Sequence, residues 1–237
     1  MSILIGIHPV AEALRARRPL DRVLVARGAA GGRLQEIIDL AREHGIPIRF
    51  EERPALDRVA GSATHQGVVA LGAEQRYAGL EDIAGNARLL VLLDGIEDPH
   101  NLGAIIRTAY AAGADAVVVP ERRASGLTET VAKASAGALE YLPVVRVTNI
   151  NRAIEQLKER GFWIYGLDER GDRDYASVTY NAPTALVFGA EGHGLHQMVR
   201  KHCDVLVRIP VAGKIPSLNV SVAAGVVLYD WKRKSPS

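Results

Sequence analysis

Residues 209–229, with the sequence IPVAGKIPSLNVSVAAGVVLY, predict the end of a strand, a loop of small residues and then a helix. Ser217 and Asn219 stand where that helix should begin, and side-chain oxygens of these residue types cap helix starts. Capping alone would explain them. However, two other loops, at Asn101 and Gly189, also place polar groups and glycines directly after apolar strands. Because ligands of open α/β sheets bind at the carboxyl ends of the strands, the three loops together predict one site.

Apolar runs alternate with helical patterns throughout the part of the chain that contains these loops. The runs are typical of strands buried on both faces of a parallel sheet, at 89–93, 116–119, 144–147, 162–165, 185–188 and 205–209. Helices are predicted between and after them, at 102–112, 129–139, 151–160, 195–201 and 218–232. This order of elements predicts an α/β domain with a doubly wound parallel sheet.

The beginning of the chain predicts a smaller α/β unit. Strands are expected at 22–26, 46–50 and 66–71, and helices at 8–18, 33–44 and 55–60. A polar stretch without a sustained period follows, so we predict an N-terminal domain at 1–72, a linker at 73–87 and a main domain at 88–237. Arginines cluster in the N-terminal unit, where they either form a solvated face or bind an anionic partner: Arg15, Arg17, Arg18, Arg22, Arg27 and Arg33.

Composition describes an ordinary globular protein. The chain has 237 residues, of which 48% are hydrophobic and 24% charged, and its formal net charge is +2. This mild basicity is compatible with a nucleic-acid partner without requiring one. The single cysteine excludes an internal disulfide framework. No apolar run approaches the roughly 20 residues of a membrane helix, and no signal peptide is recognisable, so we expect a cytoplasmic protein.

The first loop leads into a helix that carries an unusual charge. Arg107 lies six positions after Asn101 and is flanked by apolar residues. At about 100° per residue the two side chains are not on one stripe, yet both can converge on a ligand over the helix start. A structural alternative is an arginine that is ion-paired or that extends its charged end to solvent.

The second loop is rich in glycine. Gly189, Gly192 and Gly194 follow a predicted strand in the order G-x-x-G-x-G, which differs from the dinucleotide fingerprint G-x-G-x-x-G. Glycines at this place favour a pocket lined by backbone. We expect Glu191, inside the turn, to face that pocket. The histidines nearby lack a third ligand at a spacing that suits a metal.

Three sequence blocks carry a resemblance to a known family: Asn101-Leu102-Gly103 to Arg107-Thr108-Ala109, Phe188-Gly189-Ala190-Glu191-Gly192, and Ile209-Pro210 to Ser217-Leu218-Asn219-Val220-Ser221. In this order and spacing they resemble the SpoU family of the SPOUT superfamily, the RNA ribose 2′-O-methyltransferases. Two N-terminal stretches, Gly6-Ile7-His8 and His65-Gln66-Gly67, resemble the ribosomal-protein-like substrate-binding domain of the subgroup that acts on 23S rRNA guanosine. At Lys214-Ile215-Pro216 the sequence departs from the family, whose members often carry smaller polar residues there. This difference could alter the conformation of the loop and therefore its contacts with the cofactor.

The resemblance implies a deep trefoil knot, a homodimer and S-adenosylmethionine as methyl donor, with no metal. The positions that match the family's cofactor-binding residues are Leu167, Gly189, Ile209 and Leu218. The positions that match its catalytic residues are Arg107, Asn101, Glu191, Ser217 and Asn219. An arginine is a poor base, because its pKa lies above about 12. We therefore expect Arg107 to hold the target phosphate and stabilise the developing alkoxide.

Three alternatives remain open from the sequence. The RNA could be a tRNA, or the chain could be a catalytically inactive RNA-binding relative. The Gly189 loop could also bind the phosphate of a nucleotide in another type of α/β enzyme.

Overall fold

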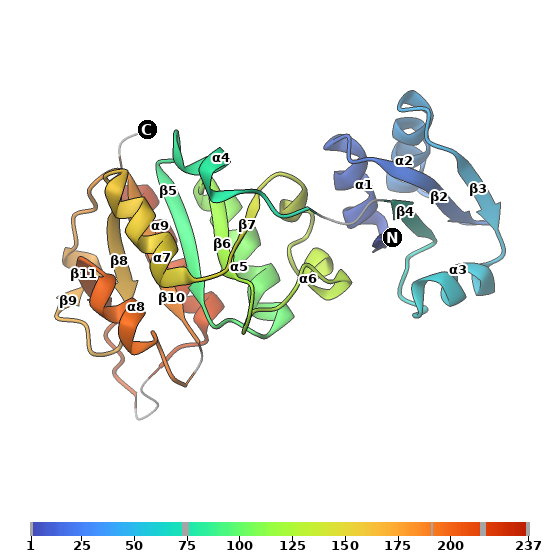
Figure 1. The fold of residues 1–237 in the computed structure, drawn as a ribbon. Helices are drawn as coiled ribbons and strands as arrows, with labels where there is room; N and C mark the ends of the chain where they lie inside the picture. Colours follow the sequence, from blue (N-terminus) through green and yellow to red (C-terminus); the bar gives the residue numbers. More distant parts are fainter. Residues whose placement is uncertain (1, 73–75, 191, 214–216, 236–237) are drawn as a thin grey trace.

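The computed structural model describes residues 2–72, 76–190, 192–213 and 217–235, which form two lobes side by side, each built on its own sheet (Figure 1). The N-terminal lobe has the strand order β1-β4-β2-β3. Its strands are β1 (Ser2–Ile5), β2 (Leu20–Ala26), β3 (Ile48–Glu51) and β4 (Val68–Gly72). Its helices are α1 (Ile7–Arg15), α2 (Gly32–Glu43) and α3 (Arg53–Ala60).

Antiparallel pairing sets the N-terminal sheet apart from a simple βαβ repeat. Strand β4 runs antiparallel to both β1 and β2, whereas β2 and β3 are parallel. Helices α1 and α2 bury their apolar faces on one side of the sheet, and α3 covers the other. The helix expected at 8–18 ends earlier, at Arg15, because Arg17 adopts a left-handed conformation with φ of 54°.

The second lobe confirms the predicted parallel sheet. Among the described residues its strand order is β7-β6-β5-β10-β8-β11-β9, and every pairing is parallel. The strands are β5 (Leu89–Asp94), β6 (Ala116–Pro120), β7 (Val144–Val147), β8 (Trp163–Leu167), β9 (Arg173–Asp174), β10 (Thr184–Gly189) and β11 (Val205–Arg208). Strand β10 is inserted between the earlier strands β5 and β8, so spatial order departs from chain order.

Helices cover both faces of this sheet, as a doubly wound fold requires. One face is covered by α5 (Pro99–Ala112), α6 (Glu129–Ala134), the 3₁₀ helix η1 (Ala138–Glu140) and α9 (Val220–Lys234). The other is covered by α4 (Leu80–Ala84), α7 (Ile150–Glu159) and α8 (Gln197–His202). A further 3₁₀ helix, η2 (Tyr175–Ser177), contacts α9. The single helix expected at 129–139 is divided into α6 and η1, because Ala136 and Gly137 both have positive φ.

The segment 73–87, which we predicted as a linker, carries structure over part of its length. Helix α4 buries Leu80 and Ala84 in the core beneath α7, and Ala78 forms a bridge to Val145. These contacts attach residues 78–87 to the second lobe. The domain boundaries 1–72, 73–87 and 88–237 stay a prediction.

The two lobes meet at a group of polar contacts that we call the interdomain clasp, formed by Glu12, Arg18, Glu140 and Tyr141. Arg18 and Glu140 pair at 2.8 Å, with only 8% and 5% of their side chains exposed. The Tyr141 hydroxyl donates to Glu12 Oε2 at 2.8 Å. Gly137 permits this approach, because a Cβ there would lie 2.3 Å from Glu12 Cγ. The lobes are therefore held together by buried side-chain charge as well as by the connecting chain.

Candidate active site

A cavity of about 750 Å³ opens at the carboxyl ends of β8, β10 and β11. Its walls come from the loops that follow these strands and from the start of α9. The lining residues are Leu167, Asp168, Glu169, Arg170, Phe188, Gly189, Ala190, Gly192, His193, Gly194, Leu195, Gln197, Arg200, Ile209, Val211, Ser217, Leu218, Asn219, Val220 and Ala223. The cavity therefore lies where the fold places ligands of parallel sheets.

The glycine-rich loop forms one wall with its backbone. Gly189 is the last residue of β10, and a Cβ there would lie 2.2 Å from the carbonyl carbon of Gly194. The loop folds back on itself, with Gly194 N donating to Ala190 O at 2.9 Å. Only glycine fits at position 189, which confirms the expected backbone-lined wall.

A buried aspartate anchors this loop to the neighbouring strand. Asp94, at the end of β5, accepts from the backbone N–H of His196 at 2.8 Å and pairs with His196 Nδ1 at 2.9 Å. Both carboxylate oxygens are used, so the loop cannot move away from β5 without losing two hydrogen bonds. This pair could not be predicted from the sequence, because its partners are 102 positions apart. Within the described parts of the chain, no cluster of three or more His, Cys, Asp or Glu suits a metal.

An amide pair joins the first and third motifs. Asn219 caps α9 by accepting from the N–H groups of Ser221 and Val222, and its Nδ2 donates to Asn101 Oδ1 at 3.0 Å. Asn101 lies in the first turn of α5 and is only 8% exposed. The helix-cap interpretation of Asn219 is thus correct. Its amide group also connects α5 to α9 beside the cavity.

Arg107 lies apart from the cavity wall. It is exposed on α5 and does not line the cavity, and its side chain has no hydrogen-bond or ion-pair partner among the described residues. The ion-paired alternative therefore finds no support in that part of the chain. Glu191 and the Lys214-Ile215-Pro216 stretch lie outside the described residues, so their expected placement stays a prediction.

The structure brings several of the predicted residues together at the cavity. The four predicted cofactor-binding residues, Leu167, Gly189, Ile209 and Leu218, all line it. So do Ser217 and Asn219, which we predicted to be catalytic. This placement is compatible with the predicted roles, which stay predictions.

Charged groups after β8 were missed by the sequence analysis. Asp168 is buried at the cavity wall, accepts from Arg170 N at 2.8 Å and lies 3.7 Å from the guanidinium of Arg200. The available signal was a polar residue directly after an apolar strand, the same signal that revealed the other loops.

The single cysteine packs close to this wall without lining it. Cys203 Sγ fills the space beside Gly166 and donates to Val199 O at 3.3 Å. Burial raises the pKa of its thiol to about 12. Cys203 is therefore a packing residue that stays protonated near neutral pH.

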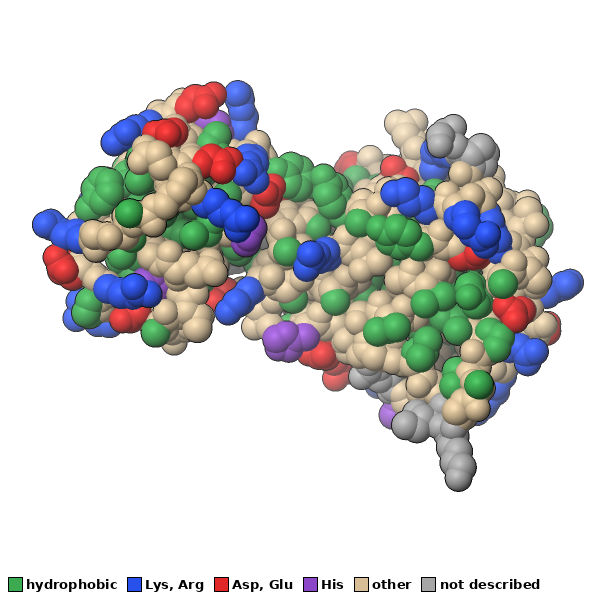
Figure 2. Space-filling model, turned by 180° about the vertical axis from the view of Figure 1, so that it is seen from behind, with side chains coloured by type: hydrophobic (Ala, Val, Ile, Leu, Met, Phe, Trp, Pro, Cys, Tyr) green, Lys and Arg blue, Asp and Glu red, His purple; other side chains and the backbone are tan. Residues whose placement is uncertain are grey.

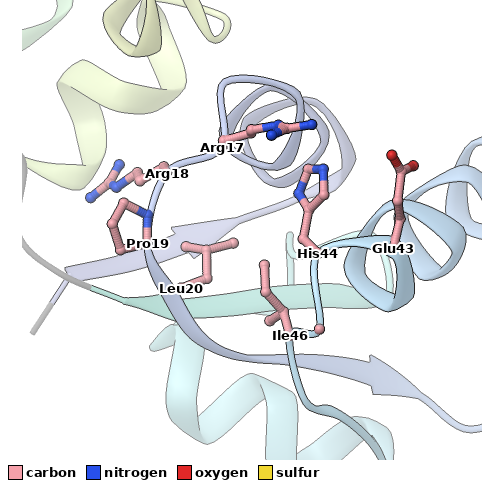
Figure 3. Close-up of a pocket in the computed structure, with 8 residues that line it drawn as sticks. Arg17, Arg18, Pro19, Leu20, Glu43, His44 and Ile46 are labelled. Carbon is pink, nitrogen blue, oxygen red and sulfur yellow. The ribbon is translucent and has the colours of Figure 1, made fainter.

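The arginine cluster of the N-terminal unit is largely paired. Arg15 pairs with Glu12 and Glu36, Arg27 pairs with Glu52, Arg33 contacts His8, and Arg18 belongs to the clasp. Only Arg17 and Arg22 lack such a partner among the described residues. Figure 3 shows Arg17, Arg18 and His44 among the residues that line a hollow of about 450 Å³, with the side chains of the two arginines pointing in different directions. The cluster is therefore not one uniform basic face.

Comparisons with known proteins agree with these features. The family model described as the SpoU rRNA Methylase family matches residues 88–229, and the model for RNA 2′-O ribose methyltransferase substrate binding matches residues 3–78. The chain is 46% identical over 237 residues to a TrmH family tRNA/rRNA methyltransferase of Bacillus subtilis, YacO, covering 98% of this chain and 95% of the relative. A Staphylococcus aureus relative named for the same family is 39% identical, with 98% and 96% covered.

A solved structure shares the architecture of both lobes. The SpoU methyltransferase AviRb from Streptomyces viridochromogenes, in complex with the cofactor AdoMet, has a TM-score of 0.84 and 29% identity, with 98% of this chain and 89% of that chain covered. No helix in the described ranges is long and apolar enough to span a bilayer. On the strength of the two matched family models and these relatives, the chain belongs to the SpoU methylase family.

Proposed function

We propose that this SpoU-family protein transfers the methyl group of S-adenosylmethionine to the ribose 2′-hydroxyl of a guanosine in 23S rRNA, in the cytoplasm. The activity of an S-adenosylmethionine-dependent RNA 2′-O-methyltransferase follows from the family. The observation that carries the assignment to this cavity is the set of four predicted cofactor-binding residues in its walls, beside the Asn219–Asn101 hydrogen bond.

The cavity fits the proposed cofactor in size and in character. Its volume lies within the range of about 300–1,000 Å³ that is usual for small-molecule sites. Leu167, Ile209 and Leu218 supply apolar surface, and the absent side chain of Gly189 leaves room for the loop backbone that forms the wall. When bound, S-adenosylmethionine supplies an electrophilic methyl group on a sulfonium.

Arg107 is proposed to act on the RNA side of the reaction. Because a guanidinium is a cation with several N–H donors and no acceptor, it serves by holding a phosphate of the target and stabilising the charge that develops on the 2′-oxygen. Its exposure and its lack of a partner among the described residues leave its donors available for this purpose. The proton passes to the phosphate or to water. Glu191 and Ser217 are proposed to orient the ribose or Arg107.

The Asn101–Asn219 pair is proposed to hold the two helices in register. One amide group caps α9 and donates to the other amide on α5, the helix that carries Arg107. A shift of α5 against α9 would therefore break a hydrogen bond at the edge of the cavity. This arrangement favours a fixed distance between the cofactor and the arginine.

The protein is proposed to be a homodimer. Leu218, Val222 and Tyr229 are exposed apolar residues on or beside α9, at helical spacing. Figure 2 shows hydrophobic side chains gathered over this part of the larger lobe. Sedimentation analysis should show a dimer that the change Val222→Asp converts to monomer. A monomeric wild type would contradict this assembly.

Replacing Arg107 with alanine tests the catalytic assignment. We expect at least about a hundredfold loss in the rate of methyl transfer, because one group that stabilises the transition state is removed. The thermal unfolding midpoint and the affinity for S-adenosylmethionine should change little, since the side chain is exposed. Arg152→Ala, an exposed arginine on α7 at the other face of the sheet, is the matched control. Near-normal turnover of the Arg107 variant would contradict the assignment.

The nature of the substrate is tested with RNA from cells that lack the gene. Methyl transfer should occur to 23S rRNA at a guanosine ribose and not to tRNA. Transfer to tRNA alone would establish the tRNA alternative instead. Stabilisation by NAD or ATP, but not by S-adenosylmethionine, in a thermal-shift assay would favour the nucleotide-binding alternative.

A further inference from the structure

Two exposed tyrosines stack against each other near the boundary between the lobes. The ring centroids of Tyr110 and Tyr141 are 5.6 Å apart with an interplanar angle of 21°. The residues remain 47% and 40% exposed. Aromatic surface of this kind is costly to leave in water, and on proteins that act on RNA it commonly stacks unpaired bases.

The pair lies next to the proposed catalytic arginine. Tyr110 follows Arg107 by three positions on α5, so the two side chains emerge on the same side of the helix, and both are exposed. Tyr141 directly follows η1, which contacts α5. The aromatic surface therefore lies between Arg107 and the N-terminal lobe.

Contacts from the N-terminal lobe fix the orientation of one ring. The Tyr141 hydroxyl donates to Glu12 Oε2 at 2.8 Å, and Glu12 also pairs with Arg15. The buried Arg18–Glu140 pair holds the preceding residue. A ring held in this way loses little conformational entropy when a flat ligand stacks on the pair.

We propose that the Tyr110–Tyr141 pair is a stacking platform for an unpaired nucleobase of the RNA substrate. This inference rests on the proposed function, which supplies RNA as the partner. A base on the platform would lie beside the ribose-phosphate held by Arg107, so the platform would select an unstacked, single-stranded target region. Stacking is tolerant of base identity, because every base has a π-face.

The test compares RNA that has bases with RNA that lacks them. Binding of the full-length protein is measured by fluorescence anisotropy with labelled single-stranded oligoadenylate and with an abasic ribose-phosphate oligomer of equal length. We expect Tyr110→Leu to weaken oligoadenylate binding about tenfold, the effect of losing one stacked base, and to leave abasic binding unchanged. Tyr110→Phe should keep the wild-type affinity for both. Trp163→Leu, which removes an exposed aromatic at the start of β8, is the matched control and should change neither.

Several outcomes would overturn the platform. Equal weakening with both oligomers would show that Tyr110 acts on the backbone or on folding. Conversion of the Tyr110→Leu protein to monomer would assign the pair to a subunit contact. Unchanged oligoadenylate binding by Tyr110→Leu would also contradict the stacking proposal. The proposed function is tested separately, because methylation of 23S rRNA by the same wild-type preparation would support it even if the stacking proposal fails.

Discussion

The cavity and the interdomain clasp hold their neighbouring segments together by opposite means. At the cavity, the loop after β10 folds back so closely that the backbone of Gly194 and Leu195 leaves no room for a Cβ at position 189. At the clasp, charged side chains from two lobes pair in a place where little of either is exposed. The cavity is therefore sensitive to added volume. The clasp is sensitive to unbalanced charge, because a buried charge without its partner is costly.

The largest effect is expected from Gly189→Ala. The new Cβ would lie 2.2 to 2.4 Å from three backbone atoms of Gly194 and Leu195, so the loop must move. We expect binding of S-adenosylmethionine, measured by titration calorimetry, to be lost. Gly126→Ala in the β6–α6 loop, where a Cβ would meet nothing within 4 Å, is the control and should bind normally. Normal binding by the Gly189 variant would show that the loop adjusts without cost.

Breaking the clasp should produce the next largest effect. Arg18→Ala leaves the buried Glu140 without this partner, and breaking such pairs costs about 3–5 kcal/mol. We expect a loss of this order in the free energy of unfolding, measured by chemical denaturation, with unchanged affinity for S-adenosylmethionine. The double change Arg18→Met with Glu140→Leu should recover most of the loss. A single variant as stable as the wild type would contradict the importance of this pair.

A smaller effect is expected from Arg17, which is next to Arg18 of the clasp in the sequence but does not belong to the clasp. Its side chain has no partner among the described residues, so it is free to contact an RNA phosphate. Arg17→Ala should reduce the slope of log affinity against log salt by about 0.7 to 0.9, as expected for one phosphate contact. Arg15→Ala, which removes an arginine already paired with two glutamates, should change the slope less. If both slopes equal that of the wild type, RNA binds elsewhere.

The smallest expected effect is a pH dependence. Burial raises the pKa of the Glu140 carboxyl above its usual 4.5, although Arg18 opposes this. The folded state therefore binds this proton more tightly than the unfolded state does, and the stability that this group contributes falls as pH rises from 4.5 through the raised value. As pH rises through that window, the free energy of unfolding of the wild type should therefore decrease relative to that of Glu140→Gln. A difference that increases with pH would mean that pairing with Arg18 outweighs burial.

The parallel sheet and the cavity loops could be predicted because their signals are local. Continuous apolar runs such as Leu89–Leu93 indicate strands buried on both faces, and the residues after them indicate loops at one edge. The helix start at Asn219 was similarly recognisable from residue type. Such signals need only a few neighbouring positions.

Contacts between distant residues could not be predicted in this way. The Arg18–Glu140 pair joins positions 122 apart, and Arg18 in the sequence looks the same as Arg17 beside it. The left-handed turn at Arg17 sends the two side chains in different directions (Figure 3). The Asp94–His196 pair was missed for the same reason, since neither residue type at its position requires the other.

The partial burial of Cys203 and its raised pKa have a practical consequence for following the two lobes in solution. Maleimide and iodoacetamide reagents attack thiolates, and a thiol whose pKa is raised to about 12 supplies very little thiolate near pH 7. A cysteine introduced on the surface of each lobe should therefore accept a fluorophore while the native thiol stays unmodified. Distance measurements between two such dyes could then report whether the lobes move when RNA binds, without first removing the native cysteine.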